Sequence, residues 1–233
     1  MAYFSQTDIE QYTGFASTDF KQAGSMMTAT QWATLCTYIV DYTTSLVNRY
    51  CGVSSFESHT ATEYHNGIGC QADDGTCLEE DSRFYLWERC ISVGTVSEDL
   101  NANTGTVEWA TRWARSAATA GDYQVMTRGE TTWVRFHNNI PLEAYDNVKI
   151  EYTAGYASGA DELDQIKWIC LRIAKNMLLE IKKTQEVMTI RQTAVRDYSQ
   201  MFEPRAKTNI LTDDIIRDLW KFRRIRLGGP TWS

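Results

Sequence analysis

Two stretches of the chain repeat apolar residues every three or four positions, the spacing of amphipathic helices. The first runs from Thr28 to Tyr50 and ends before Gly52. The second runs from about Asp161 to Lys183. Its apolar stripe is narrow and continuous: Leu163, Ile166, Cys170, Ile173, Met177 and Ile181. Because neither helix can bury such a stripe alone, we expect the two to pack face to face.

Between these helices the apolar period changes to two, and β-branched and aromatic residues dominate. Val148, Ile150 and Tyr152 alternate with polar residues, as in a strand with one buried face. The segments Tyr123–Thr127 and Thr131–Phe136 are predicted to form a hairpin closed by a three-residue loop. Further strands are predicted at Thr62–His65, Arg83–Trp87, Ile91–Ser97 and Val107–Arg112.

Shorter helices are predicted near both ends of the chain. The sequence Thr7–Glu10 has the spacing of a capping box, and the helix that it opens ends at Gly14. Thr212–Asp214 supplies a cap and two acids to a second short helix. We predict an α+β fold: a small helical bundle core of two long helices and short N- and C-terminal helices, with an inserted antiparallel β-module and an extended C-terminal tail. The expected divisions are 1–52 and 160–203 for the helical core, 53–159 for the β-module and 204–233 for the tail.

Composition narrows the classes of protein that this chain can belong to. Its 233 residues are 43% hydrophobic and include three prolines, so a globular protein without long linkers is expected. No apolar run approaches the ~20 residues of a membrane span, which predicts a soluble protein made in the cytoplasm. With 23 basic against 30 acidic residues, a basic nucleic-acid binder is disfavoured. The tail differs, because from Arg205 onward seven basic residues face three acidic ones.

The sequence holds no motif of a known catalytic class, so an enzyme is not expected. Its three histidines, His59, His65 and His137, are interpreted as strand-end or loop residues with ordinary solvation. The acidic clusters Asp73–Asp74 and Glu79–Asp81 are interpreted as solvated loops rather than as a general acid and base.

Six cysteines are scattered along the chain without a CxxC pair, and free thiols are expected. Cys36 and Cys170 fall on the apolar helix faces, where cysteine behaves as a small hydrophobic residue. The stretch from His65 to Cys77 gathers metal-ligating residue types, but its spacing fits no standard zinc site. We therefore expect no metal and no cofactor. Cys70 and Cys77 would pair only in an oxidising environment.

Several passages follow one another in a distinctive order. A short helix at Thr7–Tyr12 precedes a long helix that ends in the aromatic–glycine exit of Val47–Gly52. Tyr145–Tyr156 is a strand that ends in Tyr-x-x-Gly-Tyr and leads into an acid-capped helix at Asp161–Lys167. Glu63–Gly67 adds an aromatic–glycine turn. In order and spacing these passages resemble the head-tail connector (adaptor) proteins of tailed bacteriophages.

The resemblance spans roughly Thr7 to Gln185 and is weakest in the middle, where the β-insert is longer around Leu100 to Gly121. It implies a structural virion protein of the neck, assembled in the bacterial host cytoplasm. About twelve copies would form a ring beneath the portal, join head to tail and continue the DNA channel. The implied partners are the portal protein, other copies of the chain, a tail or stopper protein below, and double-stranded DNA that passes without specific binding. No membrane is implied.

Within this reading the C-terminal tail is expected to dock on the portal, because it combines a short apolar helix with a cationic strip. The expected docking residues are Ile215, Ile216, Leu219, Trp220, Phe222, Arg223, Arg224 and Arg226. Alternatively, this helix folds back on its own core. Two other functions stay open: a ligand- or carbohydrate-binding β-module on a helical scaffold, suggested by the many aromatic residues, and a hydrolase that uses the acidic loops.

Overall fold

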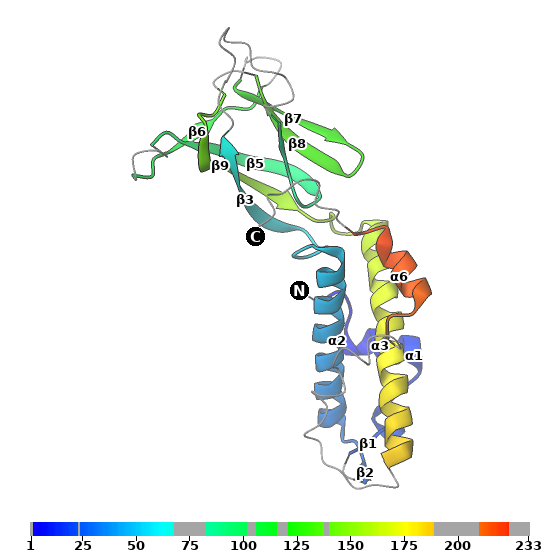
Figure 1. The fold of residues 1–233 in the computed structure, drawn as a ribbon. Coiled ribbons are helices and arrows are strands. Elements are labelled where there is room, and N and C mark those ends of the chain that lie inside the picture. Colours follow the sequence, from blue (N-terminus) through cyan, green and yellow to red (C-terminus); the bar gives the residue numbers. More distant parts are fainter. Residues whose placement is uncertain are drawn as a thin grey trace. The chain divides into compact units, whose positions relative to one another are not determined.

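The computed structural model has the predicted α+β fold and divides into two compact units (Figure 1). One unit, called here the helical unit, combines Met1–Ser54 with Gly159–Ser233, and the other, the β-unit, is Ser55–Ser158. The structure describes residues 2–22, 24–67, 83–101, 106–115, 121–137, 140–188 and 210–223.

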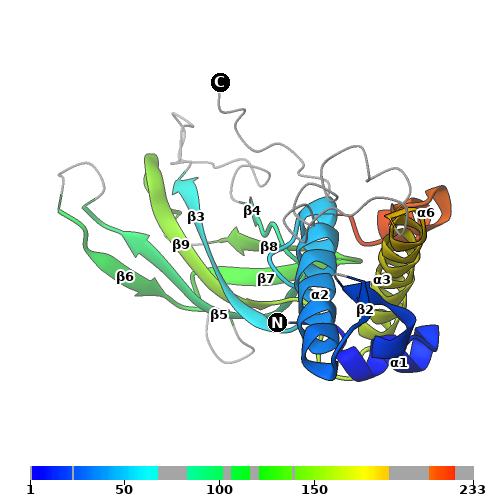
Figure 2. The ribbon, with the colours of Figure 1, turned by 90° about the horizontal axis from the view of Figure 1, so that it is seen from below.

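The helical unit is built on two long helices, α2 and α3, that lie side by side (Figures 1 and 2). In the described part of this unit the helices are α1 (Gln6–Thr13), α2 (Ala29–Cys51), α3 (Asp161–Met188) and α6 (Asp213–Trp220). A 3-10 turn (Ser17–Asp19) and the two-residue strands β1 (Lys21–Gln22) and β2 (Ser25–Met26) lie between α1 and α2. Both α1 and α6 pack against α2 and α3.

The two long helices pack face to face as predicted. Ile166, Cys170 and Ile173 of α3 are fully buried, and only Leu163 of the predicted stripe is partly exposed. At the α2 N-terminus, Thr28 and Gln31 form a capping box, and Gly52 ends the helix in the left-handed conformation. Since caps and apolar stripe both follow from local sequence, these elements could be predicted closely.

The first helix starts two residues earlier than predicted. Its capping box is Ser5 with Asp8, not Thr7 with Glu10: the Asp8 N–H donates to Ser5 Oγ at 3.3 Å, and the Ser5 N–H donates to the Asp8 carboxylate at 2.8 Å. Glu10 instead accepts a hydrogen bond from the indole N–H of Trp32 at 2.7 Å. Both Ser5 and Thr7 are good caps, and this contact with α2 removes Glu10 from the capping role.

The β-unit consists of two antiparallel sheets that share one hydrophobic core. One sheet has the order β3 (His59–Gly67), β9 (Ala144–Ala154), β5 (Cys90–Asp99), β6 (Trp109–Arg112). The other has the order β4 (Arg83–Tyr85), β8 (Thr131–Phe136), β7 (Tyr123–Arg128). The core takes residues from both sheets: Phe84, Leu86, Val96, Tyr123, Val134, Phe136, Val148, Ile150, Tyr152 and Ala154.

Strand β9 lies between β3 and β5 and buries the residues that its alternation predicts, Val148, Ile150 and Tyr152. The β7–β8 hairpin is confirmed with a shorter loop. Arg128 pairs with Thr131, so that only two residues form the turn, and Gly129 adopts a left-handed φ of 59° there. A two-residue turn needs this backbone conformation, which glycine adopts without a steric cost.

Candidate functional site: the chain junction and the exposed surfaces

The Tyr-x-x-Gly-Tyr passage forms a close junction where the chain enters and leaves the β-unit. Gly155 has a φ of 96°, and its N–H donates to the carbonyl of Arg89 at 2.9 Å. A Cβ atom at Gly155 would lie 2.4 Å from the carbonyl oxygen of Glu57. Only glycine therefore fits, for reasons of both backbone conformation and space.

Tyr156 completes this junction. Its N–H donates to the carbonyl of Phe56 at 2.7 Å, and the two rings stack with centroids 6.3 Å apart. The guanidinium of Arg89 lies 4.2 Å from the centroid of the Tyr156 ring. The end of β9 is thereby fastened to the segment that precedes β3. The role of the passage is structural, since it clamps the two ends of the insert together.

Tyr152 belongs to a buried polar network on the inner face of the four-stranded sheet. Its hydroxyl donates to the carboxylate of Glu63 and accepts the backbone N–H of Glu88 at 3.2 Å. The same carboxylate accepts the N–H of Trp87 at 2.9 Å. Burial, reinforced by Glu63, raises the pKa of Tyr152, so that its hydroxyl stays protonated and acts as a fixed donor.

Two histidines lie beside this network, and here the sequence interpretation is corrected. His65 Nε2 lies 3.2 Å from the Glu63 carboxylate, and His59 Nε2 lies 3.3 Å from the Glu88 carboxylate. Their side chains are only 14% and 24% exposed, so the expected ordinary solvation is wrong for both, although His59 does lie at the end of a strand. Both point inward because β3 alternates, with its odd-numbered residues facing the core.

The described residues offer no arrangement suited to metal binding, since no three His, Cys, Asp or Glu side chains among them converge. His137, the third histidine, lies 3.3 Å from the side chain of Gln124. The predicted loop residues Cys70, Asp73, Asp74, Cys77, Glu79, Glu80 and Asp81 lie outside the described residues. In the described helices, no segment is long and apolar enough to cross a membrane.

Helix α6, part of the expected docking element, packs on its own helical unit. Ile215, Leu219 and Phe222 are buried, and Asn176 of α3 donates to the carbonyl of Ile210 at 3.1 Å. Arg172 of α3 forms ion pairs with two acids of α6, one of them Asp218 at 2.6 Å and the other Asp214. The apolar face of this helix therefore has a partner within the chain, which corresponds to the alternative that the helix folds back on its own core.

The exposed side of α6 is cationic and aromatic. Trp220 is 55% exposed, and the Arg223 guanidinium lies 4.9 Å from its ring centroid and 5.8 Å from that of Tyr50. Arg217 and Lys221 are exposed on either side of Trp220 in sequence. We call Arg217, Trp220, Lys221 and Arg223 the α6 cationic surface. Ile216 is half-buried, and Arg224 and Arg226 lie outside the described residues.

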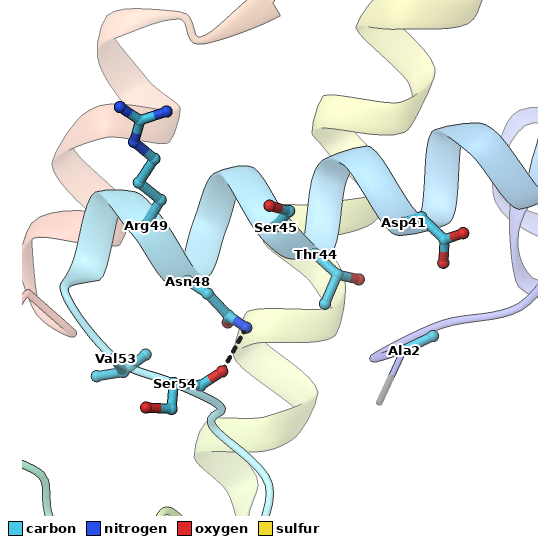
Figure 3. Close-up of a pocket in the computed structure, with 8 residues that line it drawn as sticks. All are labelled: Ala2, Asp41, Thr44, Ser45, Asn48, Arg49, Val53 and Ser54. Carbon is cyan, nitrogen blue, oxygen red and sulfur yellow. Dashed lines mark hydrogen bonds between the residues drawn. The ribbon is translucent and has the colours of Figure 1, made fainter.

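A shallow groove of about 550 Å³ lies on the outer side of α2 (Figure 3). Its lining is mostly polar: Ala2, Asp41, Thr44, Ser45, Asn48, Arg49, Val53 and Ser54. The Asn48 amide is fully engaged, since its Nδ2 donates to the Ser54 carbonyl at 3.0 Å and its Oδ1 accepts from the Tyr3 hydroxyl. The lining contains hydroxyls and the carboxylate of Asp41 but neither histidine nor cysteine.

The outer face of the four-stranded sheet carries an exposed aromatic pair. The rings of Tyr64 and Trp109 have centroids 6.0 Å apart, and Lys149 Nζ lies 5.3 Å from the Trp109 ring centroid. Lys149 also pairs with Glu151 at 3.2 Å. This pair is the feature that a ligand-binding β-module would use.

Comparisons with known proteins find similar chains among solved structures. No protein-family model matches the chain, and no curated protein matches it. Among solved structures, the chain is similar to a chain of the neck of an empty GTA particle computed with C6 symmetry. The TM-score is 0.48 at 9% sequence identity, over 97% of this chain and 92% of that chain.

Proposed function

We propose that the chain is a structural protein of a tailed-phage neck: a head-tail connector that forms a ring beneath the portal and continues the DNA channel. The observation that carries the proposal is the junction at Gly155 and Tyr156. The passage that most resembles the connector family is the one that fastens the two ends of the β-insert to each other, and in sequence this insert lies between two helices that pair. The residues of this passage hold the fold together, which is the role expected of them in a structural protein.

The distribution of charge supports a conduit. Residues 55–158 contain 16 acidic and 7 basic residues, whereas the rest of the chain contains 14 acidic and 16 basic residues. The excess negative charge is thus concentrated in the β-insert. An acidic wall repels the phosphate backbone, so that DNA can pass without being held.

The α6 cationic surface is proposed as the part that docks on the portal. Trp220 would be the anchor, because exposed aromatics carry a large share of interface energy once they are buried. Arg217, Lys221 and Arg223 would pair with acids of the portal and set the register. Ile215, Leu219 and Phe222 contribute from beneath, by holding the helix on α2 and α3.

The test uses a variant that alters only this surface, Trp220→Ala with Arg223→Ala. We expect it to fold and melt like the parent but to lose the ability to join portal-bearing heads, scored by electron microscopy of completed particles. Trp113→Ala is the matched control, since Trp113 is 73% exposed and belongs to the β-unit. Full joining by the double variant would contradict the docking role, and absence of joining by the parent would contradict the connector function.

A second candidate, ligand binding by the β-unit, is favoured by the Tyr64–Trp109 pair alone. Its test is binding of soluble oligosaccharides to the purified protein, measured by calorimetry. Micromolar binding that Trp109→Ala abolishes would support this function instead.

A further inference from the structure

Residues 142–147 lead into β9 and include its first four residues. They display a single aromatic side chain at one end of the β-unit. Tyr145 is 88% exposed, the highest value among the large hydrophobic residues that the structure describes. Leu142, Glu143 and Asp146 beside it are exposed as well. We call this segment the Tyr145 tip.

The backbone of the tip is held in a strained conformation. Asp146 has a φ of 50° and is the one non-glycine residue with a positive φ in the described part of the chain. Its N–H donates to Asn66 Oδ1 of β3 at 2.9 Å. Left-handed conformations outside glycine persist only where surrounding contacts impose them, and such positions cluster at functional sites.

A buried amide fixes the base of the tip. Asn147 is 1% exposed, its Nδ2 donates to the Leu142 carbonyl at 2.9 Å, and its Oδ1 accepts the N–H of Gly67 at 2.5 Å. A Cβ atom at Gly67 would lie 2.0 Å from the Leu142 carbonyl oxygen. The start of β9 is therefore held tightly against the end of β3.

A buried carboxylate fixes the other side of the Tyr145 tip. Glu98 of β5 is 1% exposed, accepts the Leu142 N–H at 3.0 Å and forms an ion pair with Arg112. Three strands, β3, β5 and β9, thus contribute polar groups that hold the tip in one conformation. A rigid aromatic side chain loses little conformational entropy on binding, which suits Tyr145 to an interface.

The chemistry of the tip defines its partner. The tip displays one phenol and one isobutyl group, from Tyr145 and Leu142, together with two carboxylates, Glu143 and Asp146. Carboxylates repel nucleic acid, and an apolar pair needs an apolar surface, so the partner is a protein surface with aromatic and cationic groups.

The helical unit of this same chain presents such a surface along α1 and α3. Trp168 is 58% exposed and meets the Tyr12 ring edge-on at 5.2 Å, while Lys175 Nζ lies 5.7 Å from the Tyr12 centroid. Farther along α3, Lys182 Nζ lies 5.2 Å from the Phe15 centroid. We call Tyr12, Trp168 and Lys175 the Trp168 strip.

We propose that the Tyr145 tip of one copy binds the Trp168 strip of the next copy. The inference rests on the proposed function, in which copies form a ring, and it names the two surfaces that meet. Because tip and strip are different patches, the contact is head-to-tail, which is the type that closes into a ring. Tyr145 would pack on Trp168, and the carboxylates of the tip would face Lys175.

The first experiment measures self-association of the full chain by sedimentation velocity over a concentration series. The parent is expected to associate, and Tyr145→Ala to weaken association by at least about 30-fold, the effect of an interface hot spot. Tyr85→Ala is the control, because it is the same change at a 47% exposed tyrosine of the other sheet. A parent that stays monomeric, or equal effects of the two variants, would overturn the inference.

A charge exchange excludes an effect of misfolding. Glu143→Lys and Lys175→Glu are each expected to weaken association, and the chain that carries both changes is expected to recover it. Failure of the double variant to recover would overturn the pairing. So would a loss of association caused by Trp220→Ala but not by Trp168→Ala, which would assign the α6 cationic surface as the receptor.

The tip contact and the connector function can fail independently of each other. If Tyr145→Ala still forms rings and joins portal-bearing heads like the parent, the tip contact is wrong and the connector function stands. If the parent associates through the tip but never joins such heads, the contact stands and the connector function is wrong.

Discussion

At Gly155 the absence of a side chain allows the two ends of the β-unit to lie against each other. The Cβ of Gly155→Ala would lie 2.4 Å from the Glu57 carbonyl oxygen, at a φ of 96° that alanine rarely adopts. We expect the variant to lose about 3 kcal/mol of unfolding free energy in urea titrations. Gly129→Ala is the control: its φ is 59° but nothing lies within 4 Å, so a loss of about 1 kcal/mol is expected. Equal losses would show that crowding at Glu57 is unimportant.

Burial makes individual thiols unreactive. Desolvation raises the pKa of Cys36 to about 12, with a smaller effect of the Glu10 charge, and desolvation also raises the pKa of Cys51 to about 12. At pH 8 only about one in 10⁴ of such thiols is ionised, and the thiolate is the reactive form. We expect iodoacetamide to leave both residues unmodified in the native protein and to label them in denaturant, as located by peptide mass spectrometry. Labelling of native Cys36 within minutes would contradict this burial.

At the scale of elements, the pairing of α2 with α3 sustains the helical unit. Ile173 is fully buried in α3, so Ile173→Asp places an unpaired carboxylate in the core. The cost is several kcal/mol, comparable with the stability of a whole domain, and we expect the variant to be recovered only as insoluble protein. Gln165→Asp, at an exposed position of the same helix, is expected to melt like the parent. A soluble Ile173→Asp variant with an unchanged melt would contradict the pairing.

Helix α6 is a structural part of the helical unit as well as a proposed docking element. A chain that ends at Lys207 lacks Ile215, Leu219 and Phe222 and uncovers the surface that they bury. Each buried side chain contributes about 1.5–3 kcal/mol, so we expect a clear fall in the melting temperature. A chain that ends at Arg223 keeps α6 and should melt like the parent. An unchanged melt of the shorter chain would show that α6 contributes no stability.

Sequence periodicity was sufficient to predict an element and its buried face where that face is apolar, as in α2, α3 and β9. It missed the inner face of β3, because His59, Glu63 and His65 alternate correctly but are polar, and their burial depends on Glu88 and Tyr152. The packing of α6 on the long helices also pairs Arg172 with acids more than 40 residues away, which local sequence does not reveal. Likewise, the strained Tyr145 tip depends on hydrogen bonds from β3 and β5.

At the scale of the whole molecule, the acidic β-insert sets the expected behaviour toward DNA. Filter binding of the full chain to duplex DNA at moderate salt should show weak retention, because 16 acidic residues face 7 basic ones in residues 55–158. The chain that ends at Arg223 lacks Arg224 and Arg226. A difference in DNA retention between it and the full chain would measure the binding contributed by the end of the tail. Tight retention that falls steeply with salt would reveal a basic track and contradict the conduit.

The junction at Gly155 and Tyr156 also bears on how the protein is made. Helix α2 ends at Cys51 and its partner α3 begins at Asp161, so a ribosome adds about 110 residues between them. At 5–20 residues per second this takes about 5 to 20 s, during which the face of α2 that packs on α3 is uncovered. The β-insert, whose two ends are clamped to each other, is complete before α3 emerges. Maturation of the nascent chain therefore runs from the middle outward, with the helical bundle assembled last from the first and final thirds of the translation product.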